Sequence, residues 1–451
     1  MNTDVSPLHT QQDHAEPHIS ANGPARLDRA LADYAARDWT DQAIFLNERF
    51  EAARAELGHW QALSRTSREL PPLAGLTMTV KACFDTAGWV SSCGSRVLQH
   101  AKPAMRSAAL VHKLRTAGAT LLAQTNMTEF AYGALGVNTR FGTPRTPLDP
   151  TGTRIAGGSS SGAAVAVARG YGDVAVCSDT SGSARIPAAF CGVVGFKPSR
   201  ARYDTQGMHW LSTSFDVPGL ICPTVGLCRQ VDRAITGCGA DVPSPPLAIR
   251  LAVPGTLSDM GLDEDVHALF RTCRDVLTAA GITIHEIPLD SLMDSARIAA
   301  EGGIIGAEAY ALHRHRLATD FDGYDPVVGK RLLAGRENPA YRYVDALRAL
   351  SACRDRFDRE ITGYDGFLLP TVPILPPAVA ELRDEATYLR LNRRAFSLTE
   401  FANRLDLPGI SLPVGKLPVG LMLTGIRGGD DALLAMASVL EPLVSNLQQP
   451  V

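Results

Sequence analysis

Residues 152–196 decide the fold of this chain and read GTRIAGGSSSGAAVAVARGYGDVAVCSDTSGSARIPAAFCGVVGF. Nine of these 45 residues are glycine and six are serine, yet apolar runs at 163–168 and 174–177 are long enough for a helix and a strand. Glycine inside a core costs conformational entropy and is kept where the backbone turns tightly or approaches a ligand. We therefore expect a folded segment with a function rather than a flexible linker.

Helical and strand patterns alternate on both sides of this segment. Apolar residues recur at helical spacing between 25 and 63, and Pro71-Pro72 ends that region. We expect a disordered tail at 1–25, N-terminal helices at 26–70 packed on the core, and one α/β domain at 71–445. Helices are predicted at 108–117, 163–168 and 266–280, and strands at 76–80, 120–123, 174–177, 248–253, 282–287, 367–369, 410–412 and 421–423. This alternation is typical of helices packed on a buried mixed sheet.

Composition excludes several classes of function. The chain has 451 residues, 45% hydrophobic and 20% charged, and a net charge of −3. This charge argues against binding to nucleic acid, and no apolar stretch is long enough to span a membrane. The first twenty residues lack the features of a secretory signal, so a cytoplasmic protein is expected. The nine cysteines contain no C-x-x-C pair and are expected to be buried free thiols, with no metal site.

The serine clusters at 157–162 and 179–185 allow three interpretations. A phosphate-binding loop fails because no Gly-Lys-Ser/Thr follows either cluster. A nucleophile elbow centred on Ser160 matches G-x-S-x-G, but two prolines shortly before it make the required strand poor. The third interpretation is a serine activated by lysine. Because the chain contains no Ser-x-x-Lys, that pair must form by tertiary contact, and Lys81 at the end of a predicted buried strand is the candidate.

These residues resemble the signatures of a known family. Lys81, the 157–162 run and the 179–185 run are similar to the three motifs of the amidase signature family. Ser159 and Ser183 stand 24 residues apart, which is the spacing in that family. The resemblance extends over roughly residues 70–240 and 360–440, through NMTEF at 126–130, GVVGFKP at 192–198, LPGISLP at 407–413 and PVG at 418–420.

The resemblance implies a fold and a set of roles. The fold would be a single large α/β/α body around a central mixed sheet of about eleven strands flanked by helices. Ser183 would be the acyl-forming nucleophile, Ser159 the proton bridge and Lys81 the final base. A serine hydroxyl needs an adjacent base, and a buried apolar setting favours the neutral lysine that can serve as one. The oxyanion and substrate-binding residues would be Thr180, Ser181, Gly182, Gly157, Gly158 and Met127, and no metal or cofactor is implied.

The chain departs from the family pattern at three places. Ala82-Cys83 follows the lysine where Asp-Asn is common, and Ala156 precedes the Gly-Gly-Ser-Ser run where proline is common. Ser181 occupies a position that is usually glycine, so a positive φ there would be strained. Asn126, Phe130 and Tyr132 are candidates for lining a pocket together with Met127, and Trp210 is a candidate for facing the acyl group.

The resulting prediction is an amidase that hydrolyses the carboxylic amide bond of a small molecule, with no nucleic-acid or membrane partner. Two alternatives share this chemistry: the glutaminase (A) subunit of a tRNA-dependent amidotransferase, and a carbamoyl- or allophanate-type amidohydrolase. The alternative from another class is a catalytically inactive binding or scaffold protein. A homodimer is compatible with the sequence, which does not identify the amide.

Overall fold

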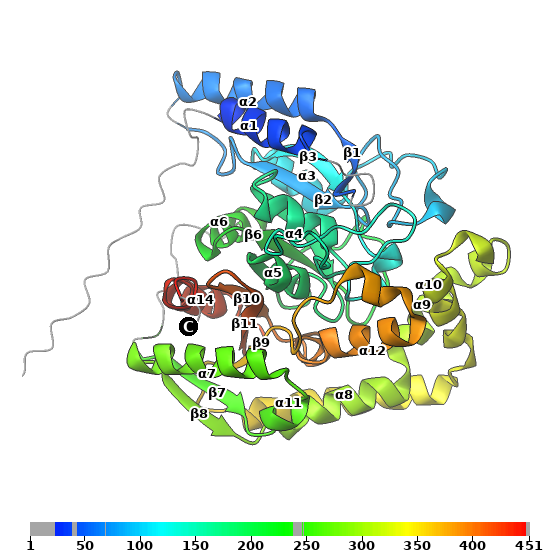
Figure 1. The fold of residues 1–451 in the computed structure, drawn as a ribbon, viewed down its shortest axis with the longest axis vertical. Helices are drawn as coiled ribbons and strands as arrows, with labels where there is room; N and C mark the ends of the chain where they lie inside the picture. Colours follow the sequence, from blue (N-terminus) through cyan, green and yellow to red (C-terminus); the bar gives the residue numbers. More distant parts are fainter. Residues whose placement is uncertain (1–22, 38–42, 68, 238–245, 247, 448–451) are drawn as a thin grey trace, which may run out of the picture.

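The computed structural model describes residues 23–37, 43–67, 69–237, 246 and 248–447 (Figure 1). Most of the tail expected at 1–25 lies outside these ranges. Helix α1 begins at Gly23, so the helical region starts slightly earlier than the sequence predicts. No helix in the described ranges is both long and apolar enough to cross a membrane.

Within the described residues, one mixed sheet of eleven strands runs through the molecule, as the resemblance implied, in the order β1-β3-β2-β4-β6-β5-β10-β11-β9-β7-β8. Strands β2, β3 and β4 are mutually parallel, as are β7, β8 and β9, and the remaining neighbours are antiparallel. The strands are β1 Phe45–Glu48, β2 Thr77–Lys81, β3 Thr120–Thr125, β4 Val174–Asp179, β5 Val194–Lys197, β6 Val217–Cys222, β7 Arg250–Pro254, β8 Thr283–Ile287, β9 Gly366–Pro370, β10 Gly409–Val414 and β11 Leu417–Gly425.

Helices cover both faces of this sheet. On β4, Val174 and Val176 belong to one apolar cluster, whereas Ala175 and Cys177 belong to another. Because alternate side chains of a strand point to opposite faces, the two clusters lie on opposite sides of the sheet. The helices are α1 Gly23–Ala35, α2 Phe50–Ser64, α3 Ala109–Thr116, α4 Ser161–Ala168, α5 Arg185–Cys191, α6 Val225–Thr236, α7 Glu264–Ala279, α8 Asp290–Gly302, α9 Ile304–Leu317, α10 Pro326–Ala334, α11 Ala340–Glu360, α12 Glu385–Phe396, α13 Glu400–Arg404 and α14 Asp430–Val444.

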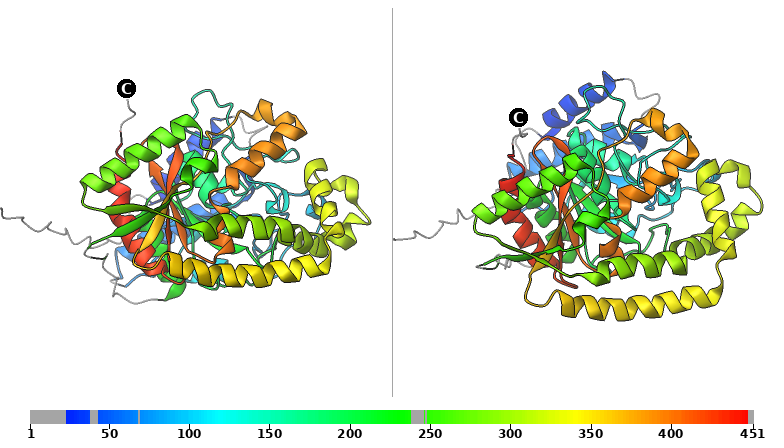
Figure 2. Two further views of the ribbon diagram at one scale, coloured as in Figure 1. Left: turned by 90° about the horizontal axis from the view of Figure 1, so that it is seen from below. Right: turned by 60° about the horizontal axis from the view of Figure 1, so that its bottom comes forward.

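Helices α8 and α11 lie side by side along one edge of the molecule (Figure 2). The chain between them forms α9 and α10, which project from the body on the side away from α7 (Figure 1). Helix α8 thus runs from the end of the sheet that holds β8 toward the projecting helices.

The sequence predicted eight of the eleven strands and missed three. Strand β1 falls where helical spacing was expected, but it pairs antiparallel with β3 at the edge of the sheet. Strands β5 and β6 are short and contain glycine, which weakens a strand pattern. The packing requires that glycine at β5, because a Cβ on Gly195 would lie 2.6 Å from the Cβ of Ala188.

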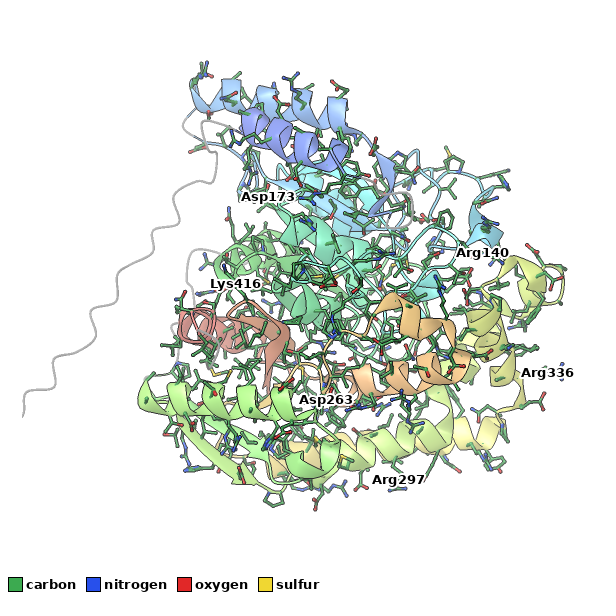
Figure 3. The ribbon with its side chains drawn as sticks, viewed as in Figure 1. Arg140, Asp173, Asp263, Arg297, Arg336 and Lys416 are labelled. Atoms are coloured by element: carbon green, nitrogen blue, oxygen red, sulfur yellow. The ribbon has the colours of Figure 1, made fainter. Side chains whose placement is uncertain are left out.

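The N-terminal helices are attached to the core through polar contacts as well as apolar ones. Asp173, labelled in Figure 3, forms an ion pair with Arg26 of α1. Its Oδ2 also accepts hydrogen bonds at 2.8 Å from the amide and the hydroxyl of Thr77, where β2 begins. One carboxylate therefore joins α1, the start of β2 and the turn that leads into β4.

The topology itself brings the predicted motifs together. Strands β2 and β4 are parallel neighbours, with Val80 opposite Val176. Their carboxyl ends therefore meet at one edge of the sheet. Lys81 is the last residue of β2, and the serine-rich loop follows directly after Asp179, the last residue of β4.

Candidate active site

Lys81 is fully buried and surrounded by hydroxyl groups. Its Nζ donates to Oγ of Ser159 at 2.7 Å, to Oγ of Ser178 at 2.9 Å and to the carbonyl of Ser178 at 3.4 Å. Ser178 can reach Lys81 because it lies on β4, which pairs in parallel with β2. The structure thus brings together Lys81 and Ser159, as predicted, and adds Ser178.

Ser159 lies in a turn whose backbone packs closely against its neighbours. The Gly158–Ser159 peptide bond is cis, and the amide of Gly158 donates to the carbonyl of Ala134 at 2.7 Å. A Cβ on Gly158 would lie 2.5 Å from the amide nitrogen of Gly136, and one on Gly157 would lie 2.7 Å from the ring of Phe190. Both glycines therefore allow the close packing of the turn that carries Ser159.

Ser160 has a different environment from Ser159. Its hydroxyl donates to the carbonyl of Ser178 at 3.5 Å, the upper limit for a hydrogen bond, and Ser160 precedes α4. Both side chains are completely buried. Of the two, the one in contact with the lysine is Ser159, which favours the lysine-activated serine over an elbow centred on Ser160.

The loop that carries Ser183 is organised by Asp179. Its carboxylate accepts from the amides of Gly182 at 2.8 Å and Ala184 at 3.1 Å, and from the guanidinium of Arg185 at 2.9 and 3.0 Å. Nδ2 of Asn403 also donates to the carbonyl of Asp179 at 2.9 Å. Burial alone would raise the pKa of Asp179, but the charge and hydrogen bonds of Arg185 lower it to about 2.

The positive φ in this loop falls on Gly182 and not on Ser181, where it would have been strained. Ser181 does not have a positive φ, whereas Gly182 has a φ of 126°. A Cβ on Gly182 would also lie 2.1 Å from Oγ1 of Thr399. Serine at 181 is therefore unstrained. The amide of Gly182 already donates to Asp179, which leaves the amides of Thr180, Ser181 and Ser183 as the candidate oxyanion donors.

Asp216 holds the other end of the same loop. It is buried and accepts from the hydroxyl of Thr180 at 2.6 Å and from the amides of Leu211 and Ser212 at 2.7 and 3.1 Å. Burial raises its pKa to about 6 despite these hydrogen bonds. Thr180 is thereby fixed through its side chain.

A cavity of about 510 Å³ opens beside the loop, and its lining includes Thr180, Ser181 and Ser183. Tyr132 also lines it, as predicted. Asn126, Met127, Phe130 and Trp210 are not among its lining residues, and the lining residue next to Trp210 is Leu211.

Asn126, Met127 and Phe130 make contacts that hold the surrounding structure together. Nδ2 of Asn126 donates to the carbonyl of Ala43 at 2.8 Å, which ties the N-terminal region to the core. Met127 is completely buried, and its carbonyl accepts from Nδ2 of Asn138 at 2.8 Å. The ring of Phe130 packs edge-on against His313, with a centroid distance of 4.3 Å.

Two departures from the family pattern have physical explanations. The amide of Ala156 donates to the carbonyl of Pro144 at 3.1 Å, a bond that proline at this position could not make. Cys83 is buried with its Sγ 3.6 Å from Oγ of Ser178, so it extends the network around Lys81. Burial raises the pKa of the Cys83 thiol, which keeps it neutral.

Four polar residues of this region were missed by sequence reasoning: Ser178, Asp216, Thr399 and Asn403. Each contacts a residue at least 36 positions away, so no local spacing identifies the partner. The one available signal was a serine within a buried strand, since a buried hydroxyl requires a hydrogen-bond partner.

Metal-binding groups and disulfides are absent from the part of the chain that the structure describes. No group of three or more His, Cys, Asp or Glu side chains there could hold a metal ion. The eight cysteines within the described ranges are buried and free, as the sequence predicted.

The fold and the site define an α/β protein with a buried lysine–serine contact and a cavity whose lining includes Ser181 and Ser183. The sequence profile of the Amidase family matches residues 30–434, and the chain belongs to this family. Membership confirms the resemblance and shows an enzyme that hydrolyses carbon–nitrogen bonds.

Individual relatives differ in their named activities. The chain is 30% identical to 2-amino-5-chloromuconic acid deaminase of Comamonas testosteroni, over 87% of this chain and 86% of the relative. It is 32% identical to a glutamyl-tRNA(Gln) amidotransferase subunit of Halobacterium salinarum, over 82% of this chain and 96% of the relative. A crystal structure of an amidase superposes with a TM-score of 0.84 at 31% identity, over 94% of this chain and 96% of the other.

Proposed function

We propose that this protein hydrolyses the amide bond of a small molecule through an acyl-enzyme on Ser183. The observation that supports it most directly is the buried 2.7 Å contact between Nζ of Lys81 and Oγ of Ser159, together with a cavity whose lining includes Ser183. Such a set supplies a nucleophile, a bridging hydroxyl and a base.

The proposed reaction has two balanced halves. Oγ of Ser183 attacks the amide carbonyl carbon while its proton moves to Ser159, and the Ser159 hydroxyl passes its proton to Lys81, which acts as the base. When the tetrahedral intermediate collapses, the C–N bond breaks and the leaving amine takes the proton back along the same path. Water then attacks the ester carbon, gives its proton to the relay and releases the carboxylic acid with Ser183 restored.

The oxyanion of the intermediate would be bound by backbone amides of the loop at 180–183. Because Gly182 donates to Asp179, the proposal assigns this role to the amides of Thr180, Ser181 and Ser183. A single well-placed donor of this kind contributes about 3–4 kcal/mol to transition-state stabilisation. We assign a structural role to Gly182, Gly157 and Gly158, because they let the backbone of the two loops pass close to neighbouring atoms.

A second candidate is the glutaminase component of a tRNA-dependent amidotransferase, favoured by the 32% identity to the Halobacterium salinarum protein over 96% of its length. It uses the same serine and lysine residues but works with partner proteins. A third candidate is a carbamoyl- or allophanate-type amidohydrolase, which would use the same chemistry on a different amide. These alternatives differ in substrate and partner rather than in the bond that is broken.

Labelling with a fluorophosphonate tests the proposal without knowledge of the substrate. The purified full-length protein is treated with the reagent, and the adduct is located by mass spectrometry. We expect the adduct on Ser183 and its loss in Lys81→Ala, because the serine is unreactive without its base. Circular dichroism of the variant serves as the folding control.

Other labelling outcomes lead to different conclusions. An adduct on Ser160 would replace the proposal with the nucleophile-elbow interpretation. A folded protein that gives no adduct would contradict an independently active amidase and favour the partner-dependent glutaminase or an inactive binding protein. Glutaminase activity that rises only with partner proteins and tRNA would then identify the former.

A further inference from the structure

The cavity beside Ser183 has an unequal distribution of charge. Its charged lining residues are four arginines and one glutamate: Arg297, Arg331, Arg393, Arg404 and Glu400. Arg297, on α8 and labelled in Figure 3, has its own acidic partners in Asp294 and Glu301. The cavity therefore has an excess of positive charge even after the Glu400–Arg404 pair is counted as neutral, and such a field attracts anions.

One of these arginines is buried and incompletely paired. Nη2 of Arg404 donates to Glu400, and each side chain of the pair is only 9% exposed. The other amino group, Nη1, is buried and has no hydrogen-bond partner among the described residues. A buried guanidinium donor without a partner is costly, so a nearby acceptor would be strongly favoured.

The short helix that carries this pair is fastened to the nucleophile loop at two points. Oγ1 of Thr399 donates to the carbonyl of Ser181 at 2.5 Å. Nδ2 of Asn403 donates to the carbonyl of Asp179 at 2.9 Å. Both bonds reach the loop just before Ser183, so the backbone of Arg404 is held at a fixed distance from the candidate nucleophile.

A second arginine shows how the cavity wall is pre-organised. The guanidinium of Arg331 lies 3.9 Å from the ring centroid of Tyr132, and its Nη1 donates to the carbonyl of Tyr132 at 2.5 Å. Stacking on an aromatic ring fixes the plane of a guanidinium while leaving its edge available for an anion. Positive charge is thus placed on both Arg404 and Arg331 around one cavity.

We propose that the amide substrate carries a carboxylate group and that Arg404 binds it through Nη1, with Glu400 holding the guanidinium in place. This inference rests on the proposed function, because it identifies the substrate class of the same site. Guanidinium and carboxylate match in geometry and charge, and binding in a buried setting strengthens the pair. A substrate anchored in this way presents its amide carbon to Ser183 from a fixed distance.

Competition against fluorophosphonate labelling tests the proposal. The probes are the monoamides of malonic, succinic and glutaric acid, which carry one carboxylate, and the matching neutral diamides. We expect at least one monoamide to protect Ser183 about tenfold better than its diamide. Equal protection by neutral and charged members of every pair would overturn the proposal.

Variants assign the effect to Arg404. Arg404→Met alone leaves Glu400 buried without its partner, so the double variant Glu400→Gln/Arg404→Met is made beside it. In both, protection by the monoamide, measured relative to each variant's own labelling rate without competitor, is expected to fall about tenfold or more. Arg297→Met is the matched control at the same cavity, and it should change protection by less than about threefold. Unchanged protection in the folded double variant would contradict the role of Arg404.

A direct binding measurement separates failure of this inference from failure of the proposed function. Isothermal titration of the same monoamides into Ser183→Ala protein measures affinity without catalysis or labelling. If this binding depends on the carboxylate and on Arg404 while the protein with Ser183 intact is never labelled, the inference is supported and the role of Ser183 as nucleophile is contradicted. Labelling of Ser183 with no preference for the charged probes would support the role of Ser183 as nucleophile and contradict carboxylate binding by Arg404.

Discussion

Arg185 and Asp179 form an ion pair at 2.9 Å in which neither side chain has any exposed area. The two residues enclose the nucleophile loop between them, and the same carboxylate accepts the amides of Gly182 and Ala184. The loop is therefore shaped around a buried charge rather than around apolar packing. Its geometry depends on that charge having its partner.

Removing Arg185 should destabilise the fold strongly. Arg185→Met leaves the Asp179 carboxylate buried and uncompensated, which typically costs about 3–5 kcal/mol. Urea unfolding at pH 7 measures the loss, with Arg297→Met as a control whose solvent-exposed ion pairs contribute little to stability. Since the pKa of Asp179 is lowered to about 2, its contribution to stability is present above its unfolded value of 3.8 and is lost as the pH falls toward 2. Equal loss in both variants would argue against a structural role for the buried pair.

Ser183→Ala should abolish amide turnover, whereas Ser160→Ala should have a mild effect. Loss of a serine nucleophile lowers kcat by about 10⁴-fold or more, and the fold should be retained because the change removes only a hydroxyl. Ser160 donates one hydrogen bond at the distance limit, so little depends on it. Steady-state hydrolysis of a substrate found by the competition experiment, with thermal unfolding as a folding control, checks both. Inactivity of Ser160→Ala alone would reverse the assignment.

Ser178→Ala should lower kcat about tenfold and leave KM nearly unchanged, because one hydrogen bond that positions Lys81 is lost. Nζ of Lys81 keeps its contact with Ser159 and with the carbonyl of Ser178. Ser161→Ala is the matched control, since the buried Ser161 hydroxyl has no hydrogen-bond partner among the described residues. A KM effect without a kcat effect would show that Ser178 acts on substrate binding instead.

Gly182→Ala should destabilise the protein by at least about 3 kcal/mol, through positive φ and overlap together. The φ of 126° disfavours a side chain, and the new Cβ would lie 2.1 Å from Oγ1 of Thr399. Gly170→Ala supplies the control, because Gly170 has a φ of 70° but nothing within 4 Å of its Cβ position. That variant should lose about 1 kcal/mol. Similar unfolding curves for the two variants would remove the steric part of the explanation.

Glu129 should make the protein less stable as the pH rises from about 4.5 to 7. Its carboxyl accepts from Ser95 and from the amide of Asp325, but burial raises its pKa to about 7. The folded protein therefore binds a proton in this range that the unfolded chain releases, and stability falls with increasing pH by up to about 3 kcal/mol. Glu129→Gln should flatten this part of the curve in urea titrations at several pH values. Parallel curves for the two proteins would contradict the assignment.

The sequence predicted those residues of the site that lie in short local motifs. Glycine at 157, 158 and 182 is required by close backbone packing, and at 157 and 182 also by a positive φ. The strand ending on Lys81 and the one ending on Asp179 were visible as apolar runs. Strand β1 was not, because its pairing with β3 depends on a partner 75 or more residues away.

The sequence by itself determined the family, the eight strands with clear apolar runs and the order of the candidate lysine and serines. Only the tertiary structure decided which hydroxyls surround Lys81 and that the amide of Gly182 is used by Asp179. It also placed Arg404 in the cavity lining, with a buried Nη1 that has no hydrogen-bond partner among the described residues. The physical reason is that local conformation follows from neighbouring residues, whereas a contact such as that between Lys81 and Ser178, 97 residues apart, depends on the parallel register of β2 and β4.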